Sequence, residues 1–369
     1  MKLLNGFRDR RVVRHFLNRI EGLSCGRRVR VMEVCGTHTM AFSRSGVRSM
    51  VHDSVDLLSG PGCPVCVTSQ ADCDAVIDLT AREDVIVATF GDMIRVPGSR
   101  GSLAEARALG GRVQVVYSPM DALELAVRHP QRTVVFVGVG FETTAPGIAA
   151  TIKTAAERGI ENFLVYMALK RIKPAMELLA ALPHLSVDAF LCPGHVSVIT
   201  GVEPYLALAS EFKRPCVITG FEPTDLVEGL SMILAQISEG RSEVEIQYRR
   251  AVKPEGNPVA LSLLDEVFVP VDAVWRGVGS IGESGYALSE GYRSMDAIEK
   301  MDIEIGSVEE PPGCRCGEVL TGAVRPADCP QFGMACTPTQ PIGPCMVSSE
   351  GSCAAYFLYG EERISVDRP

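Results

Sequence analysis

Two cysteines separated by two residues could carry redox or metal chemistry. In Cys63-Pro64-Val65-Cys66 the short spacing lets both thiols meet at one turn. Such a pair can cycle between dithiol and disulfide, or bind a soft metal, and backbone N–H groups at a helix start would favour its thiolate form. We expect this turn to face solvent. The alternative is a pair of inert thiols buried in the core.

A second motif combines a thiol with an imidazole. In Cys35-Gly36-Thr37-His38 the two side chains are three residues apart, and both are good ligands for iron or zinc. A Cys–His nucleophile pair is the enzymatic alternative. The structural alternative is a small buried cysteine that ends a strand, followed by a histidine at a turn.

The C-terminal region concentrates the remaining thiols. Six of the 13 cysteines fall in a proline-rich stretch, at Cys314, Cys316, Cys329, Cys336, Cys345 and Cys353. Four thiolates suffice for a structural zinc or an iron–sulfur cluster. The stretch lacks the Cys-x-x-Cys hooks of zinc ribbons, and its wide gaps favour a cluster wrapped by irregular chain. We predict Cys329, Cys336 and Cys353 as ligands, with Cys314 or Cys316 as the fourth, and we assign Cys345 no definite role.

The rest of the chain alternates strand-like and helix-like stretches. Short β-branched runs occur at residues 29–34, 55–58, 85–90, 113–117, 134–139, 163–167, 188–191 and 216–219. Helix-like stretches include residues 102–109, 120–128, 146–158 and 173–182. This pattern predicts an α/β fold with two parallel-sheet domains facing a cleft, followed by a C-terminal cysteine-rich iron–sulfur domain. The approximate boundaries are 1–130, 131–255 and 256–369, and the first two domains could exchange segments.

Polar or Gly/Pro-rich turns follow nearly every predicted strand. Ligands bind beyond the carboxyl ends of parallel strands, so these turns are expected to line the cleft. Besides the two cysteine motifs, the expected lining residues are Asp92, Glu142, Thr143, Thr144, His195 and Glu222. The Glu142-Thr143-Thr144 run could equally cap the helix that starts near Pro146. Asp92 could likewise either bind a ligand or cap a turn.

Composition excludes several function classes. The net charge is −9 and aromatic residues make up only 6% of the chain, which argues against nucleic-acid binding. The longest apolar stretches are strand-sized, so no membrane segment is expected. Charged residues interrupt the N-terminus before a signal core develops, which favours a cytoplasmic protein. In a reducing compartment its cysteines are expected to bind metal or do redox work.

Taken together, the motifs resemble those of the HypD family of [NiFe]-hydrogenase maturation proteins. The resemblance rests on residues 35–38 and 60–66, which contain the two cysteine motifs above. It also rests on matching runs at residues 90–93, 140–146, 193–196, 220–223 and 314–353. It implies a scaffold that assembles the Fe(CN)2CO group, with a small chaperone, HypC, that docks and shares the iron. HypE would deliver cyanide, with HypF acting upstream, and the free protein would be a monomer with a [4Fe–4S] cluster.

The same resemblance implies roles for the first two motifs. Cys35 would bind iron, with help from His38, and Cys63 and Cys66 would do thiol redox work. The chain would then be a maturation scaffold with redox activity rather than an independent turnover enzyme. The competing hypotheses are a stand-alone iron–sulfur-dependent thiol/disulfide oxidoreductase, which leaves Cys35 and His38 without a task, and a passive iron-binding or structural-zinc protein.

Overall fold

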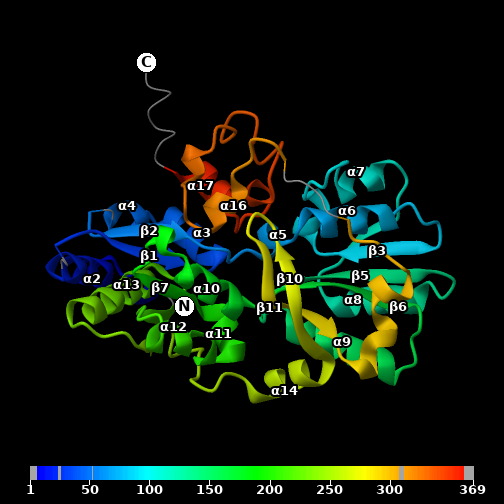
Figure 1. The fold of residues 1–369 in the computed structure, drawn as a ribbon, viewed down its shortest axis with the longest axis horizontal. Coiled ribbons are helices and arrows are strands. Elements are labelled where there is room, and N and C mark those ends of the chain that lie inside the picture. Colours follow the sequence, from blue (N-terminus) through cyan, green and yellow to red (C-terminus); the bar gives the residue numbers. More distant parts are fainter. Residues whose placement is uncertain (1–5, 24–25, 52, 307–310, 361–369) are drawn as a thin grey trace.

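The computed structural model describes residues 6–23, 26–51, 53–306 and 311–360. Two parallel sheets lie side by side, and a long two-stranded hairpin rises between them toward the C-terminal cysteine-rich segment, residues 311–360 (Figure 1). Within the described parts of the chain, no helix is both long and apolar enough to cross a membrane.

The first sheet has five parallel strands in the order β2-β1-β7-β8-β9. They are β1 (Val29–Glu33), β2 (Val55–Ser59), β7 (Ala189–Pro193), β8 (Cys216–Thr219) and β9 (Val244–Ile246). One face is covered by α2 (Arg10–Gly22) and α13 (Pro223–Ser238), which pack against each other over an apolar cluster. The inner strands β7 and β8 are buried along their whole length, which explains their largely apolar sequences.

The second sheet has four parallel strands in the order β4-β3-β5-β6. They are β3 (Val85–Thr89), β4 (Val113–Val115), β5 (Thr133–Gly140) and β6 (Phe163–Leu169). Helices α8 (Pro119–Arg128) and α9 (Ala145–Glu157) pack on β5 and on each other through the cluster around Phe136 and Ile148. Helix α8 begins sharply because Ser118 and Asp121 form a reciprocal capping box, with Pro119 in the first turn.

The eight predicted strands and the two parallel sheets are confirmed, but the sheets use non-contiguous parts of the chain. The first sheet takes strands from residues 29–59 and 189–246, which flank the whole of the second sheet. The boundary expected at residue 130 falls between α8 and β5, which pack together. Strand β9, only three residues long, was not predicted, and it adds a fifth strand at the edge of the first sheet.

Residues 258–300, expected in the C-terminal domain, pack instead on the second sheet. Helix α14 (Pro258–Val267) lies on α9, and α15 (Ala297–Lys300) lies on β6. Between them, β10 (Phe268–Trp275) and β11 (Gly279–Leu288) form an antiparallel hairpin that also contacts β6. The hairpin was not predicted.

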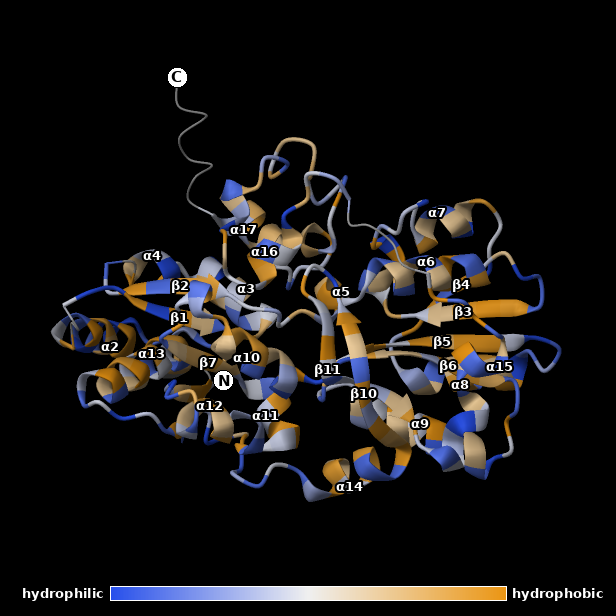
Figure 2. Ribbon diagram, in the orientation of Figure 1, coloured by the Kyte–Doolittle hydropathy of each residue, from blue (hydrophilic) through white to orange (hydrophobic). Residues whose placement is uncertain are grey.

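The cysteine-rich segment is made of short helices joined by loops. It contains α16 (Cys316–Leu320), η6 (Pro326–Asp328), η7 (Pro344–Met346) and α17 (Ser352–Tyr359). Its buried side chains belong to the same apolar core as residues of both sheets. Figure 2 shows the contrast between the hydrophobic strands β3 and β5 and the mixed colouring of this segment.

The remaining helices connect these parts. They are η1 (Gly6–Arg8), α3 (Gly36–Ser45), α4 (Val47–Met50), α5 (Pro64–Val67), α6 (Gln70–Leu79), η2 (Gly91–Arg95), α7 (Leu103–Ala108), α10 (Ile172–Ala181), η3 (Pro183–Leu185), α11 (Gly194–Thr200), η4 (Glu203–Tyr205), α12 (Leu206–Ser210) and η5 (Glu290–Met295). Two of them, α3 and α5, begin where β1 and β2 lead into the cysteine motifs.

Candidate thiol and metal site

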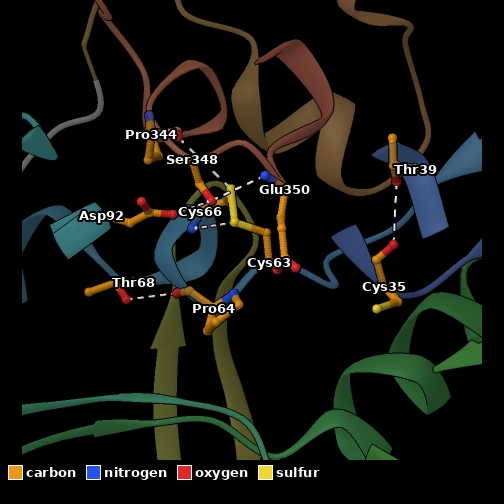
Figure 3. The surroundings of a disulfide bond; sticks show 10 residues. All are labelled: Cys35, Thr39, Cys63, Pro64, Cys66, Thr68, Asp92, Pro344, Ser348 and Glu350. Carbon is orange, nitrogen blue, oxygen red and sulfur yellow. Dashed lines mark hydrogen bonds between the residues drawn. A yellow bond between two sulfur atoms is a disulfide. The ribbon is translucent and has the colours of Figure 1, made fainter. Parts of the chain in front are cut away.

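Cys63 and Cys66 form a disulfide at the start of α5, with their Cα atoms 5.2 Å apart (Figure 3). Cys63 is the extended residue that caps the helix, and Pro64 occupies its first turn. The amide N–H of Cys66 donates to Cys63 Sγ over 3.2 Å. The Cys-x-x-Cys spacing therefore does bring both sulfurs together at a strand-to-helix turn.

This turn does not face solvent, contrary to our expectation. Cys63 is 3% exposed and Cys66 is fully buried. The cover comes from the cysteine-rich segment, since α5 packs on η7 and Cys66 Sγ lies 3.9 Å from the Pro344 carbonyl oxygen. A contact across 278 positions of sequence has no local signature. The pair is buried, but as a disulfide rather than as two inert thiols.

Cys35 lies against the same turn. It precedes α3, and the Gly36 N–H donates to the Gly62 carbonyl oxygen over 3.1 Å. A Cβ atom at Gly62 would lie 2.3 Å from the Cys35 amide nitrogen, so only glycine permits this approach. The close backbone contact places Cys35 beside the residue that precedes Cys63.

Glu350, which the sequence analysis missed, borders Cys35. Thr37 Oγ1 donates to Glu350 Oε1 over 2.6 Å, and a Cβ at Gly36 would lie 2.3 Å from the Glu350 carbonyl oxygen. In the view of Figure 3 the Glu350 side chain extends between the disulfide and Cys35. Burial, and then the charge of Glu350, raise the pKa of the Cys35 thiol to about 11. The polar run Ser348-Ser349-Glu350 among the cysteines was the available signal.

His38 is fully buried and held in one tautomer. Its Nε2 lies 3.1 Å from the Gly220 carbonyl oxygen and 3.3 Å from that of Thr219, so Nε2 carries the proton. Its Nδ1 has no hydrogen-bond partner among the described residues. Burial lowers the pKa of His38 to about 4, which keeps the ring neutral at physiological pH. A neutral imidazole whose other nitrogen binds a carbonyl is the form that ligates metals.

The Phe221 ring is stacked between His38 and His195. Its centroid lies 4.6 Å from the His38 ring and 4.0 Å from the His195 ring. His195 is exposed, whereas His38 is not. Glu222, the next residue, caps α13 and pairs with Arg8 over 2.6 Å. Three turns of the first sheet thus bring His38, His195 and Glu222 to one edge.

Asp92 and the Glu142 turn belong to the second sheet. Asp92 Oδ2 accepts a 2.7 Å hydrogen bond from Ser348 Oγ, so Asp92 contacts the cysteine-rich segment. Glu142 is buried, its Oε1 accepts from the Ile172 amide over 3.0 Å, and burial raises its pKa to about 7. Thr143 is exposed, and Thr144 precedes α9 without a side-chain cap. In the described structure no recorded hydrogen bond or ion pair joins the Glu142 turn to Cys35 or to the disulfide.

The C-terminal cysteines converge on one place. Five of them line a single cavity, namely Cys314, Cys316, Cys329, Cys336 and Cys353. Cys345 is fully buried beside them, and its thiol and that of Cys316 hydrogen-bond to Cys353, lowering the pKa of Cys353 to about 6. Iron–sulfur clusters use thiolate donors, so the residues present fit such a group by donor chemistry. Within the described residues the side chains are gathered but do not form a ready-made metal site.

The fold and these motifs define an α/β protein with a redox-type thiol pair and a cysteine-rich C-terminal segment. Comparison with known sequences shows which family of such proteins it belongs to. The chain belongs to the HypD family, because residues 11–360 match the family model described as "HypD: Hydrogenase formation hypA family". It is 43% identical to the hydrogenase maturation factor HypD of Rhodobacter capsulatus, over 98% of this chain and 99% of that protein.

Two further relatives span similar lengths. The hydrogenase maturation factor HypD of Escherichia coli (strain K12) is 43% identical over 95% of both chains. A putative hydrogenase expression/formation protein of Methanocaldococcus jannaschii is 40% identical over 95% of this chain and 98% of its own. The resemblance seen in the sequence is confirmed, and the chain is a hydrogenase maturation factor of the HypD family.

Proposed function

We propose that the protein is a scaffold for assembling the Fe(CN)2CO group of [NiFe]-hydrogenase, working in the cytoplasm with a HypC-type small chaperone. The observation that carries this proposal is the contact of Cys35 with the Cys63–Cys66 turn. A thiol able to hold iron and a thiol pair able to supply electrons lie on adjoining stretches of backbone.

Iron is the cargo, and Cys35 is its proposed anchor. A soft thiolate suits low-spin iron with strong-field ligands. The raised pKa of Cys35 keeps its thiol protonated at neutral pH, so iron binding releases a proton. The Nδ1 of His38 has no hydrogen-bond partner among the described residues, which supports a ligating or orienting role for that ring.

The thiol pair supplies the electrons for cyanide delivery. Breaking the S–C bond of a thiocyanate on the HypE cysteine, to leave cyanide on iron and a thiolate on HypE, needs two electrons. Oxidation of the Cys63/Cys66 dithiol to a disulfide provides two electrons and releases two protons. The disulfide in the structure is therefore the spent form of the pair, which must be reduced before the next delivery.

Four of the six C-terminal cysteines are proposed to hold a [4Fe–4S] cluster. The ligands are Cys329, Cys336 and Cys353, with Cys314 or Cys316 as the fourth. Such a cluster supplies single electrons at low potential. The packing of α5 on η7, which contains Cys345, supports electron transfer toward the disulfide.

The test is infrared spectroscopy of the protein purified anaerobically with the small chaperone. We expect cyanide and carbon monoxide bands in the unaltered complex and their loss in Cys35→Ala, with the cysteine-rich segment still folded. Cys216→Ala, which removes a buried cysteine of β8, is the matched control and should retain the bands. Unchanged bands in Cys35→Ala would show that iron is held elsewhere.

The stand-alone oxidoreductase hypothesis predicts a different outcome. Such an enzyme would turn over a disulfide substrate without the chaperone and without diatomic ligands. Its activity would depend on Cys63 and Cys66 and be indifferent to Cys35. The proximity of Cys35 to the thiol pair favours the scaffold.

A further inference from the structure

Arg48 joins three elements that each lead to a thiol group. It lies in α4, and its Nη2 donates a hydrogen bond to Glu33 Oε1. Its Nη1 donates to the Leu57 carbonyl oxygen over 3.0 Å and to the Tyr356 hydroxyl over 3.0 Å. The guanidinium also lies over the Tyr356 ring, with its Cζ atom 5.0 Å from the ring centroid. One side chain is thereby bound to β1, β2 and α17.

Each of these elements carries a part of the candidate site. Glu33 ends β1, two residues before Cys35. Leu57 lies in β2, the strand that leads to the disulfide. Tyr356 lies one helical turn after Cys353 in α17, so the two side chains are neighbours on that helix. The contact between α4 and α17 spans 308 positions of sequence, and it ties the cysteine-rich segment to the strands of the first sheet.

The ion pair between Glu33 and Arg48 is poorly explained by stability. The Glu33 side chain is fully buried, and that of Arg48 is 20% exposed. Ser59 Oγ donates to Glu33 Oε1 over 3.4 Å, whereas Glu33 Oε2 and Arg48 Nε have no hydrogen-bond partner among the described residues. Replacing a buried ion pair by well-packed apolar residues is often neutral or stabilising. What the pair adds is direction, because the planar guanidinium fixes the angles at which its partners lie.

We propose that Arg48 is a positioning residue that holds α17 at a fixed distance and angle to the strands leading to Cys35 and the disulfide. The proposal rests on the cluster of the proposed function, in which Cys353 of α17 is a ligand. Reduction of the disulfide takes two electrons, delivered one at a time by the reduced cluster, and two protons from water, and it yields two thiols. A displacement of about 1 Å between reacting groups can cost about 100-fold in rate, so a shift of α17 should slow this step.

The test follows reduction of the disulfide in anaerobic protein after mixing with dithionite. Samples are alkylated at intervals, and mass spectrometry counts the free thiols at Cys63 and Cys66. Arg48→Met alone leaves the Glu33 carboxylate buried without a counter-ion, so it should lower the urea midpoint of unfolding. The double variant Glu33→Gln/Arg48→Met removes both charges and should recover that midpoint, yet its disulfide should be reduced about 10- to 100-fold more slowly.

Two further variants and a second readout separate position from mere attachment. Tyr356→Phe removes only the hydroxyl that accepts from Nη1, and it should also slow the reduction, by a smaller factor. Arg325→Met is the matched control, because Arg325 also ties the cysteine-rich segment to β2, through Asp56 over 2.8 Å, but with a half-exposed side chain. It should leave the rate unaltered. Hydrogen exchange of the α17 amides, measured with or without a loaded cluster, should be faster in Glu33→Gln/Arg48→Met than in Arg325→Met.

Reduction at the unaltered rate in a folded Glu33→Gln/Arg48→Met protein would overturn the proposal. Equal slowing in Arg325→Met would overturn it too, because attachment of the segment, and not the place of Arg48, would then govern the rate. If the double variant does not fold, an unaltered rate in Tyr356→Phe overturns the proposal.

Cys329→Ser, which removes a proposed ligand, measures reduction that bypasses the cluster. If this variant reduces its disulfide as fast as the unaltered protein, the proposed function fails at that point. Hydrogen exchange of the α17 amides then still decides whether Arg48 positions that helix, and equal exchange in the double variant and in the unaltered protein would show that it does not.

Discussion

Thr37 Oγ1 donates a hydrogen bond of 2.6 Å to Glu350 Oε1 across 313 positions of sequence. This bond joins the first turn of α3, which follows Cys35, to the loop between η7 and α17. It makes the cysteine-rich segment part of the Cys35 site, rather than a separate electron-carrying appendage. The chemistry proposed for Cys35 therefore depends on a carboxylate supplied from the other end of the chain.

Replacing Glu350 by Gln should lower the pKa of Cys35. The amide can still accept the Thr37 hydrogen bond, but the negative charge that disfavours the thiolate is gone. Since burial is the larger cause, the pKa should fall by no more than about one unit, worth about 1.4 kcal/mol. The measurement is the pH dependence of Cys35 alkylation, resolved by mass spectrometry. Glu203→Gln, at a carboxylate paired with Lys173, is the control and should leave the pKa of Cys35 unaltered.

Glu142 should make stability depend on pH. Its folded-state pKa of about 7 lies above the usual value of 4.5, so the folded protein holds this proton more tightly than the unfolded chain. The resulting stabilisation is complete below about pH 4.5 and is lost as pH rises through 7. Glu142→Gln should therefore exceed the unaltered protein in stability at pH 8, by up to about 3 kcal/mol, and match it near pH 5.

Urea unfolding at the two pH values measures this difference. The exposed Glu124→Gln, which breaks an ion pair with Arg158, is the matched control and should show no such trend. If the difference in free energy of unfolding between Glu142→Gln and the unaltered protein is the same at both pH values, Glu142 does not titrate in this range.

Gly62→Ala should separate Cys35 from the disulfide turn. The added methyl would meet the Cys35 backbone at 2.3 Å, which requires a backbone shift and costs about 1–3 kcal/mol. We expect lower stability to urea and weaker diatomic infrared bands, with the cluster content unchanged. Gly147→Ala, in α9 with open space around its Cβ position, should instead be neutral or slightly stabilising. Full infrared bands in Gly62→Ala would show that this contact is not needed.

Single Ser substitutions at Cys329 and Cys353 should bleach the cluster absorbance. Both residues line the cavity of the cysteine-rich segment, and metal binding there also contributes folding free energy. The segment should accordingly become more sensitive to protease. Cys73→Ser, at a buried cysteine of α6 that is absent from this cavity, is the comparison. Full cluster occupancy in the Cys329→Ser and Cys353→Ser variants would refute the ligand assignment.

Local patterns predicted eight of the strands because each is a short, largely apolar run that ends near a polar or Gly/Pro-rich turn. The same patterns could not give the sheet order, since pairing β1 with β7 depends on packing between segments about 160 residues apart. The hairpin was missed because Val269, Val271 and Val274 are exposed and Pro270 interrupts the strand pattern.

The thiol site was predicted from residue types and adjoining turns, and its burial was not. A turn rich in Gly and Pro is ordinarily exposed, and nothing near Cys66 in the sequence indicates that Pro344 covers it. Glu350 was overlooked for a related reason, because the cysteines around it drew attention to metal binding and its contact with Thr37 is entirely tertiary.

The burial of the disulfide has a kinetic consequence. Thiol–disulfide exchange requires a thiolate to reach a sulfur atom, and here 3% of Cys63 and none of Cys66 is open to solvent. Glutathione therefore has little access to either sulfur atom, even where the glutathione pool favours reduction of the disulfide. In the redox role proposed above, the pair would therefore exchange electrons with the protein's own reaction partners rather than with the thiol pool of the cell.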